Sequence, residues 1–129
     1  MDNLQIEGTR KTPGINFQYQ DGVLEFKGKS IPENPIKFYS PVIEWLDSYA
    51  ALPQSKTVVK MSFEYFNTAS SSMILKIFKM IEALQQNGNE VTIKWFYEQD
   101  DEFLLEAGED YKSLVNVPFE FVEVPEFNF

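Results

Sequence analysis

The chain has 129 residues, 43% of them hydrophobic and 16% aromatic, which fits one domain with a single bulky core over residues 1–129. It contains no cysteine and no histidine, which excludes disulfides, thiol nucleophiles, zinc sites built on these residues and Ser-His triads. The net charge of −9 lies entirely in residues 98–129, which disfavours nucleic acid and anionic lipid as partners. A basic protein partner or simple solubility explains this acidic quarter.

The sequence shows no membrane-spanning run and no signal-peptide pattern at its start. No apolar run is long enough to cross a bilayer, and residues 1–5 lack the basic and apolar parts of a signal peptide. We therefore expect a cytoplasmic protein without membrane insertion.

The first part of the chain predicts a hairpin followed by a helix. Residues 1–12 form an irregular arm or a short edge strand, and apolar and polar residues then alternate over 15–19 and 23–26 around a turn signal. The loop at 32–35 can cap a helix whose apolar spacing runs from 36 to 49. Pro41 lies inside that spacing, so the regular helix either begins near this residue or is kinked there.

Strands and helices alternate along the rest of the chain. Residues 56–66 are almost continuously apolar, which is typical of a central strand covered on both faces. A second helix over about 69–86, a strand over 91–97, a third helix beginning at 100–102 and a last strand over 119–124 follow, leaving a short tail at 125–129. This order predicts an α/β fold with a mixed, mostly parallel sheet, an N-terminal hairpin and about three helices.

The third helix has a predicted inner face and a predicted close contact. Its inward positions are expected to be Phe103, Leu104, Ala107, Tyr111 and Leu114. Gly108 lowers helix stability by about 1 kcal/mol relative to Ala, so it is expected to mark a close approach to the sheet. Trp45 and Trp95, each within an apolar pattern, are expected in the core.

A cluster of hydroxyls stands where the 56–66 strand passes into the second helix. The first turn of a helix has unpaired N–H groups and about half a positive charge, which suit a capping oxygen or a phosphate. Asn67, Thr68 or Ser70 can supply the cap. With Ser71 and Ser72 the cluster still holds more hydroxyls than one cap requires, which makes it a candidate site.

The acids of the third helix are a second candidate. Carboxylates can act as general acids or bases or bind hard cations, but acid–base work needs a cleft, for which 129 residues leave little room, and acids on a helix surface usually face water. No EF-hand or phosphate loop is present. Glu106, Glu109 and Asp110 are therefore interpreted as a surface for a basic partner, with no metal, no cofactor and no catalytic residue expected.

The order of strand, Asn-Thr-x-Ser, long helix, Asn-Gly and strand resembles the switch region of the STAS domains, the anti-sigma-factor antagonists. More closely, the chain resembles the SiaC family of regulatory phosphoproteins. The motifs that carry this resemblance run from residue 8 to about 122: Gly8-Thr9 with Thr12-Pro13, Pro32-Glu33-Asn34, Val42-Ile43-Glu44-Trp45-Leu46, Tyr65-Phe66-Asn67-Thr68, Ile93-Lys94-Trp95-Phe96-Tyr97, and Glu109-Asp110-Tyr111 leading to Pro118-Phe119.

The resemblance implies that Thr68 is a regulatory phosphosite, supported by Asn67 and Ser70. It implies a dedicated protein kinase, a PP2C-like phosphatase, and binding of the unphosphorylated form to a diguanylate cyclase, and thus a role in bacterial cyclic di-GMP signalling and biofilm control. Ala69 stands where a second Ser is common in the family. Two alternatives remain open at this point. One is a STAS-like module that binds a small molecule or nucleotide near the start of the second helix. The other is a metal-dependent enzyme that uses Glu106 and Asp110.

Overall fold

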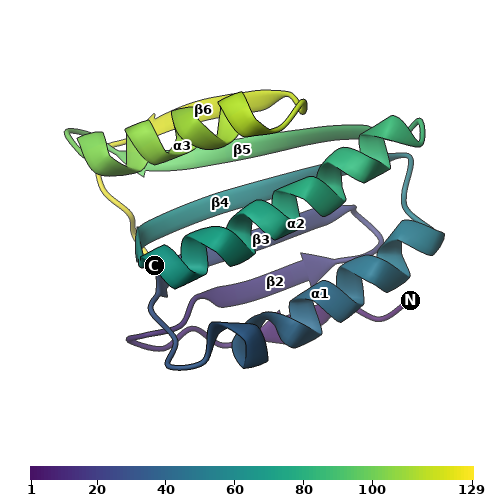
Figure 1. The fold of residues 1–129 in the computed structure, drawn as a ribbon, viewed down its shortest axis with the longest axis horizontal. Helices are drawn as coiled ribbons and strands as arrows, with labels where there is room; N and C mark the ends of the chain where they lie inside the picture. Colours follow the sequence, from purple (N-terminus) through teal and green to yellow (C-terminus); the bar gives the residue numbers. More distant parts are fainter.

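In the computed structural model, residues 1–129 form a six-stranded sheet with three helices on one face (Figure 1). The strands are β1 (Leu4–Ile6), β2 (Gly14–Gln18), β3 (Val23–Ser30), β4 (Lys56–Phe66), β5 (Glu90–Glu98) and β6 (Phe119–Val124). The helices are α1 (Pro35–Ala51), α2 (Thr68–Gln86) and α3 (Glu102–Leu114).

The strands lie in the sheet in the same order as in the chain. The pairs β1–β2 and β2–β3 are antiparallel, whereas β3, β4, β5 and β6 are parallel to one another. Each crossover thus moves one strand further in the same direction, and right-handed crossovers of this kind place all three helices on the same face. The predicted α/β fold with a mixed, mostly parallel sheet and an N-terminal hairpin is confirmed.

The other face of the sheet has no helix over it (Figure 1), so the expectation that the 56–66 strand is covered on both faces was wrong. Burial along β4 alternates: Val59 and Met61 are buried beneath the helices, whereas Val58 and Lys60 point to the open face and are half-exposed. The strand looked continuously apolar because one apolar residue, Val58, belongs to the open face, while the other residues on that side are polar.

Helix α1 begins at Pro35, so the alternative in which the regular helix starts near Pro41 was wrong. Asn34 caps it by accepting a hydrogen bond from the backbone N–H of Lys37 at 3.1 Å, and Pro35 occupies its first position. The helix then continues through Pro41, which lies on its exposed side. Pro41 has no N–H to donate to the Lys37 carbonyl. Because Lys37 is exposed, its carbonyl can bond water instead, so the helix persists.

Helix α3 lies against β5 and contributes a close contact there. A Cβ atom at Gly108 would lie 2.6 Å from the ring of Trp95 and 2.8 Å from that of Phe121, so the predicted close approach is confirmed. The prediction for Phe103 and Leu114 was wrong, because these side chains are 54% and 52% exposed. They lie at the two ends of α3, beyond the part that the sheet covers.

Candidate functional site

The start of α2 lies at the edge of the sheet where the parallel strands end. Asn67 alone joins β4 to α2, and its backbone N–H donates to the Ser30 carbonyl at 3.1 Å, which ties this joint to the end of β3. The side chain of Asn67 accepts from the backbone N–H of Ser70 at 2.9 Å. Asn67, rather than Thr68 or Ser70, is therefore the cap of this helix.

Thr68 is the first residue of α2 and is exposed. Its hydroxyl has no hydrogen-bond partner within the chain, while its carbonyl accepts from the Ser71 hydroxyl at 2.6 Å. The N–H groups of Thr68 and Ala69 precede the first backbone hydrogen bond of the helix, so they remain free for an anion. Thr68 thus combines an accessible hydroxyl with a backbone that favours negative charge.

Ser70 has the opposite environment, because its side chain is completely buried. Its hydroxyl donates to the Ser30 carbonyl at 2.9 Å and accepts from the Ser30 hydroxyl at 2.8 Å, and the Ser30 hydroxyl also pairs with that of Tyr39 at 2.6 Å. Burial raises the pKa of Tyr39 to about 12, although the hydrogen bond with Ser30 lowers it, so this phenol is neutral at physiological pH. The network ties α2 to β3 and α1.

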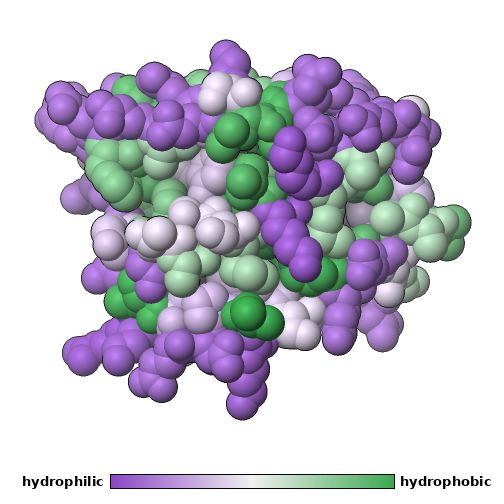
Figure 2. Space-filling view, viewed as in Figure 1, coloured by the Kyte–Doolittle hydropathy of each residue, from purple (hydrophilic) through white to green (hydrophobic).

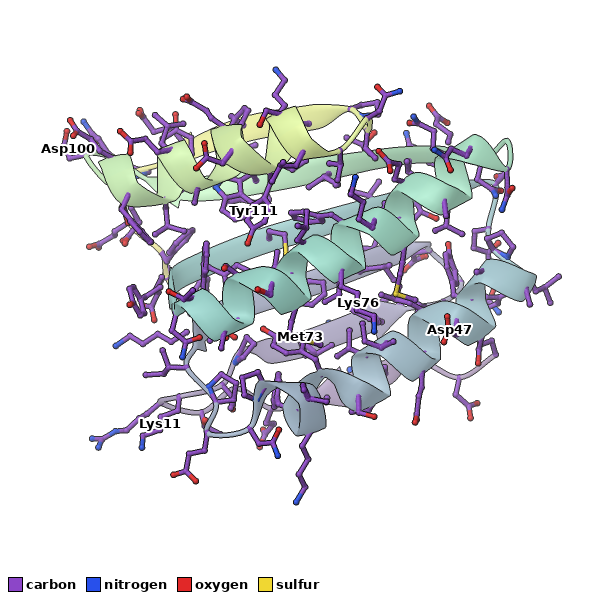
Figure 3. The ribbon with its side chains drawn as sticks, in the orientation of Figure 1. Lys11, Asp47, Met73, Lys76, Asp100 and Tyr111 are labelled. Atoms are coloured by element: carbon purple, nitrogen blue, oxygen red, sulfur yellow. The ribbon has the colours of Figure 1, made fainter.

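The remaining two hydroxyls of the cluster are less constrained. Ser71 is half-buried, and its carbonyl accepts from the Tyr111 hydroxyl at 2.9 Å. Burial raises the pKa of Tyr111 above its usual range, and this residue reaches from α3 towards α2 (Figure 3). Ser72 is exposed on the same side of α2. Of the four hydroxyls, only those of Thr68 and Ser72 are therefore open to a modifying enzyme.

A groove of about 350 Å³ separates α2 from α3 and begins one helical turn beyond Thr68. Its lining comes from both helices and the end of β4: Phe66, Ser71, Ser72, Leu75, Phe103, Glu106, Ala107, Asp110, Tyr111 and Leu114. Figure 2 shows apolar surface in this region, bordered by a hydrophilic margin. The groove therefore places apolar surface and acids beside the candidate site.

The structure divides the three acids that the sequence grouped together. Glu106 and Asp110, one helical turn apart, both line the groove, whereas Glu109 is exposed elsewhere on α3. No three carboxylates in the chain gather closely enough to hold a metal ion. The arrangement provides one acidic margin beside an apolar floor.

The aromatic residues at the end of the groove were not anticipated from the sequence. Tyr65 is 46% exposed and stacks on Phe103, with ring centroids 6.1 Å apart and planes inclined at 24°. A signal for this surface was present in α3, where the apolar positions recur from Phe103 to Leu114 and thus extend beyond the buried residues Leu104 and Tyr111.

Away from the groove, Thr9 and Thr12 form a compact turn, with their hydroxyl oxygens 2.7 Å apart. The turn borders a second, polar hollow with Lys27, Lys29 and Glu64. None of the helices is both long and apolar enough to span a bilayer.

The chain has clear relatives in sequence and in fold. An uncharacterised protein of Pseudomonas aeruginosa (strain UCBPP-PA14) is 31% identical over 119 residues, which is 92% of this chain and 94% of the relative. The structure of SiaC of Pseudomonas aeruginosa is similar with a TM-score of 0.89 and 29% identity, over 96% of this chain and 100% of that chain. A chain in the crystal structure of the diguanylate cyclase SiaD in complex with its activator SiaC, from the same species, also has a TM-score of 0.89, with 30% identity over 94% of this chain and 99% of that chain.

A family profile agrees with these likenesses. The description SiaC family regulatory phosphoprotein matches residues 6–124, which include the start of α2 and the groove. With nearly the whole sequence and the whole fold matched, this chain belongs to the SiaC family of regulatory phosphoproteins.

Proposed function

We propose that this chain is a non-catalytic partner-switch protein of the cytoplasm, controlled by reversible phosphorylation of Thr68. A protein kinase adds the phosphate and a PP2C-like phosphatase removes it. The unphosphorylated form binds and regulates a signalling partner, for which the homologous complex with SiaD points to a diguanylate cyclase. The single observation that carries the proposal is the exposed, unbonded hydroxyl of Thr68 at the start of α2.

The position of Thr68 makes its phosphorylation compatible with the fold. A phosphate adds about −1.5 to −2 charges at neutral pH. At the start of α2 it meets free N–H groups and the positive end of the helix dipole, which stabilise an exposed anion by roughly 0.3–1 kcal/mol. Asn67 and Ser70 support the site because their hydrogen bonds hold the first turn in place.

The same phosphate is costly when a partner covers it. An unmatched charge that loses its water at an interface destabilises a complex by about 3–5 kcal/mol. This exceeds the roughly 2.7 kcal/mol that corresponds to a hundredfold change in affinity. Phosphorylation of Thr68 therefore changes binding far more than folding. Glu106 and Asp110 line the groove, which supports a partner surface there.

Phosphorylation with ATP and the cognate kinase tests the site. We expect mass spectrometry to find one phosphate in the wild type and in Ser72→Ala, and none in Thr68→Ala. Ser72→Ala is the matched control, because Ser72 is the other exposed hydroxyl of this segment. Undiminished phosphate incorporation in Thr68→Ala would show that Thr68 is not the phosphosite, so that the switch lies at another residue or does not exist.

Binding to the cyclase tests the consequence. We expect Thr68→Asp to melt within a few degrees of the wild type but to bind the cyclase about a hundredfold more weakly. Thr68→Ala is expected to bind the cyclase with the affinity of the unphosphorylated wild type. Equal affinity of the wild type before and after stoichiometric phosphorylation would contradict the switch.

A further inference from the structure

We propose that the groove between α2 and α3 receives one amphipathic helix of the partner, with an apolar stripe flanked by Lys or Arg. This deepens the proposed function, since it names the partner surface that Thr68 would control. It rests on that function only for the role of Thr68, because the groove is present in the unphosphorylated chain.

The two sides of α2 differ in how they are covered. Helix α1 packs along one side of α2, whereas α3 lies further from the other side. Helix α3 contacts α2 through two hydrogen bonds and through the Tyr111 ring, which packs edge-on against Phe78 with centroids 5.1 Å apart. The Tyr111 hydroxyl donates to the Ser71 carbonyl at 2.9 Å, and Lys79 Nζ donates to the Leu114 carbonyl at 2.8 Å. The space that a fourth helix would occupy is therefore the groove itself.

The groove has the apolar surface that such a helix needs. Leu75, Ala107 and Tyr111 lie along it, and Phe103 and Leu114 at its ends are more than half exposed. A patch of this kind beside polar margins is typical of an interaction site. An added strand is a poor occupant, because its N–H and C=O groups would face apolar side chains without a sheet edge to pair with.

The length of the groove sets the length of the occupant. Phe103 and Leu114 are separated by eleven positions of α3, which corresponds to roughly 16 Å of helix axis. About three turns of partner helix would cover this distance, with apolar anchors at positions i, i+3 or i+4, and i+7.

The charge of the groove selects the flanking residues of the occupant. Glu106 and Asp110 are the charged residues of its lining. Lys79, beside Leu114 at the far end of the groove, already donates from Nζ to the Leu114 carbonyl and lies 3.6 Å from Glu82 Oε1. Lys76 points towards α1 rather than α3 (Figure 3). Cations flanking the apolar stripe would therefore meet unpaired carboxylates, which provides charge complementarity.

Thr68 lies one turn before Ser71 and Ser72, at the end of the groove where Tyr65 stacks on Phe103. A phosphate there would meet the apolar stripe of the partner rather than its cations, which lie beside Glu106 and Asp110. Desolvation of the phosphate thus opposes docking even though the partner is basic.

Two synthetic helical peptides test the proposal with the unphosphorylated full chain. Each has about 14 residues with Leu at the stripe positions, and they differ only in carrying Lys or Glu beside the stripe. By fluorescence anisotropy we expect the Lys peptide to bind at least about tenfold more tightly than the Glu peptide. Equal binding of the two peptides, or no binding of the Lys peptide, would overturn the proposal.

Matched variants locate the binding. The double variant Glu106→Lys with Asp110→Lys is expected to weaken the Lys peptide by about tenfold or more, and Glu109→Lys on the same helix by less than about threefold. Phe103→Ser should weaken it similarly, whereas Ile36→Ser, which alters an exposed apolar residue of α1, should not. Circular dichroism confirms that each variant is folded. Equal effects of Glu109→Lys and the double variant would place the peptide elsewhere and overturn the proposal.

A second copy of the chain is the competing occupant. Sedimentation that shows a dimer dissociated by Phe103→Ser would overturn the proposal, because the groove would then be a self-interface. The kinase assay on Thr68 is independent of these results: lost peptide binding with intact phosphorylation rejects the groove alone, and intact peptide binding without phosphorylation rejects the switch alone.

Discussion

The four hydroxyls at the start of α2 have nearly the same sequence surroundings but different environments. Thr68 is exposed and unbonded, whereas Ser70 is buried and bonded to Ser30. Phosphorylation of Ser70 would require the first turn of α2 to open and the network with Tyr39 to break. Thr68 can be modified without either change, so we expect it to be the residue that carries the phosphate.

The buried network also predicts a pH dependence. Burial raises the pKa of Tyr39 from 10.0 to about 12. Below pH 10 the Tyr39 phenol is neutral in the folded and in the unfolded chain, so its full contribution to the free energy of unfolding is present. Between pH 10 and 12 the unfolded chain ionises first, so the free energy of unfolding falls as pH rises, by about 2.7 kcal/mol for two pKa units.

Denaturant unfolding at several pH values measures this fall. The matched variant is Tyr39→Phe, which is expected to lose less stability between pH 10 and 12 than the wild type, each relative to its own value at about pH 8. Tyr111, whose pKa is also raised by burial, leaves part of the decline in the variant. Identical declines in the two proteins would contradict the assignment to Tyr39.

At the scale of the elements, α3 is positioned by its contact with β5. Trp95 donates from Nε1 to the Leu104 carbonyl at 2.9 Å, and its ring lies against Gly108. This contact holds one face of α3 on the sheet while Phe103, Glu106 and Asp110 face the groove. The geometry of the groove therefore depends on Gly108.

Substitution of Gly108 tests that dependence. Ala at this position gains about 1 kcal/mol of helix propensity, but its Cβ would lie 2.6 Å from the Trp95 ring, and overpacking of this kind costs about 1–3 kcal/mol. We expect Gly108→Ala to be destabilised overall in urea unfolding, whereas Ser48→Ala on the exposed side of α1 stays within about 0.5 kcal/mol of the wild type. A stabilised Gly108→Ala would show that α3 moves away easily.

Across the whole molecule, the excess negative charge lies at one edge, because the charges of residues 1–97 sum to zero. The acids of residues 98–129 lie on and after β5, around α3 and β6, while Arg10, Lys11, Lys27 and Lys29 lie beside β2 and β3. Lys11 and Asp100 mark these opposite edges in Figure 3. Such a distribution steers a basic partner towards the α3 edge.

Steering predicts a salt-dependent association rate. Exposed charges are screened beyond about 8 Å at physiological ionic strength, so association of the Lys peptide should slow as salt rises from about 50 mM to about 500 mM. Reversal of Glu120 and Glu123, exposed acids of β6 outside the groove, should slow association while leaving dissociation unchanged. Stopped-flow fluorescence separates the association rate from the dissociation rate. If neither salt nor charge reversal changes the association rate, these acids contribute to solubility rather than to steering.

From the sequence alone it was possible to predict the elements, their order and a cluster of hydroxyls at the start of α2. Apolar periodicity, the presence of capping residues before α1 and α2, and the handedness of the crossovers are local or general properties, so they could be predicted without a structure. The choice of Asn67 over Thr68 and Ser70 as the cap of α2 required the structure. The folded structure shows which hydroxyl is accessible, since Ser70 is buried and hydrogen-bonded to Ser30, forty positions away. It alone decided that Glu106 and Asp110, but not Glu109, line a groove, and that Phe103 is exposed. Periodicity shows which residues share a side of α3, but the distance between α3 and α2 depends on contacts such as Trp95 with Gly108, which join residues distant in the chain.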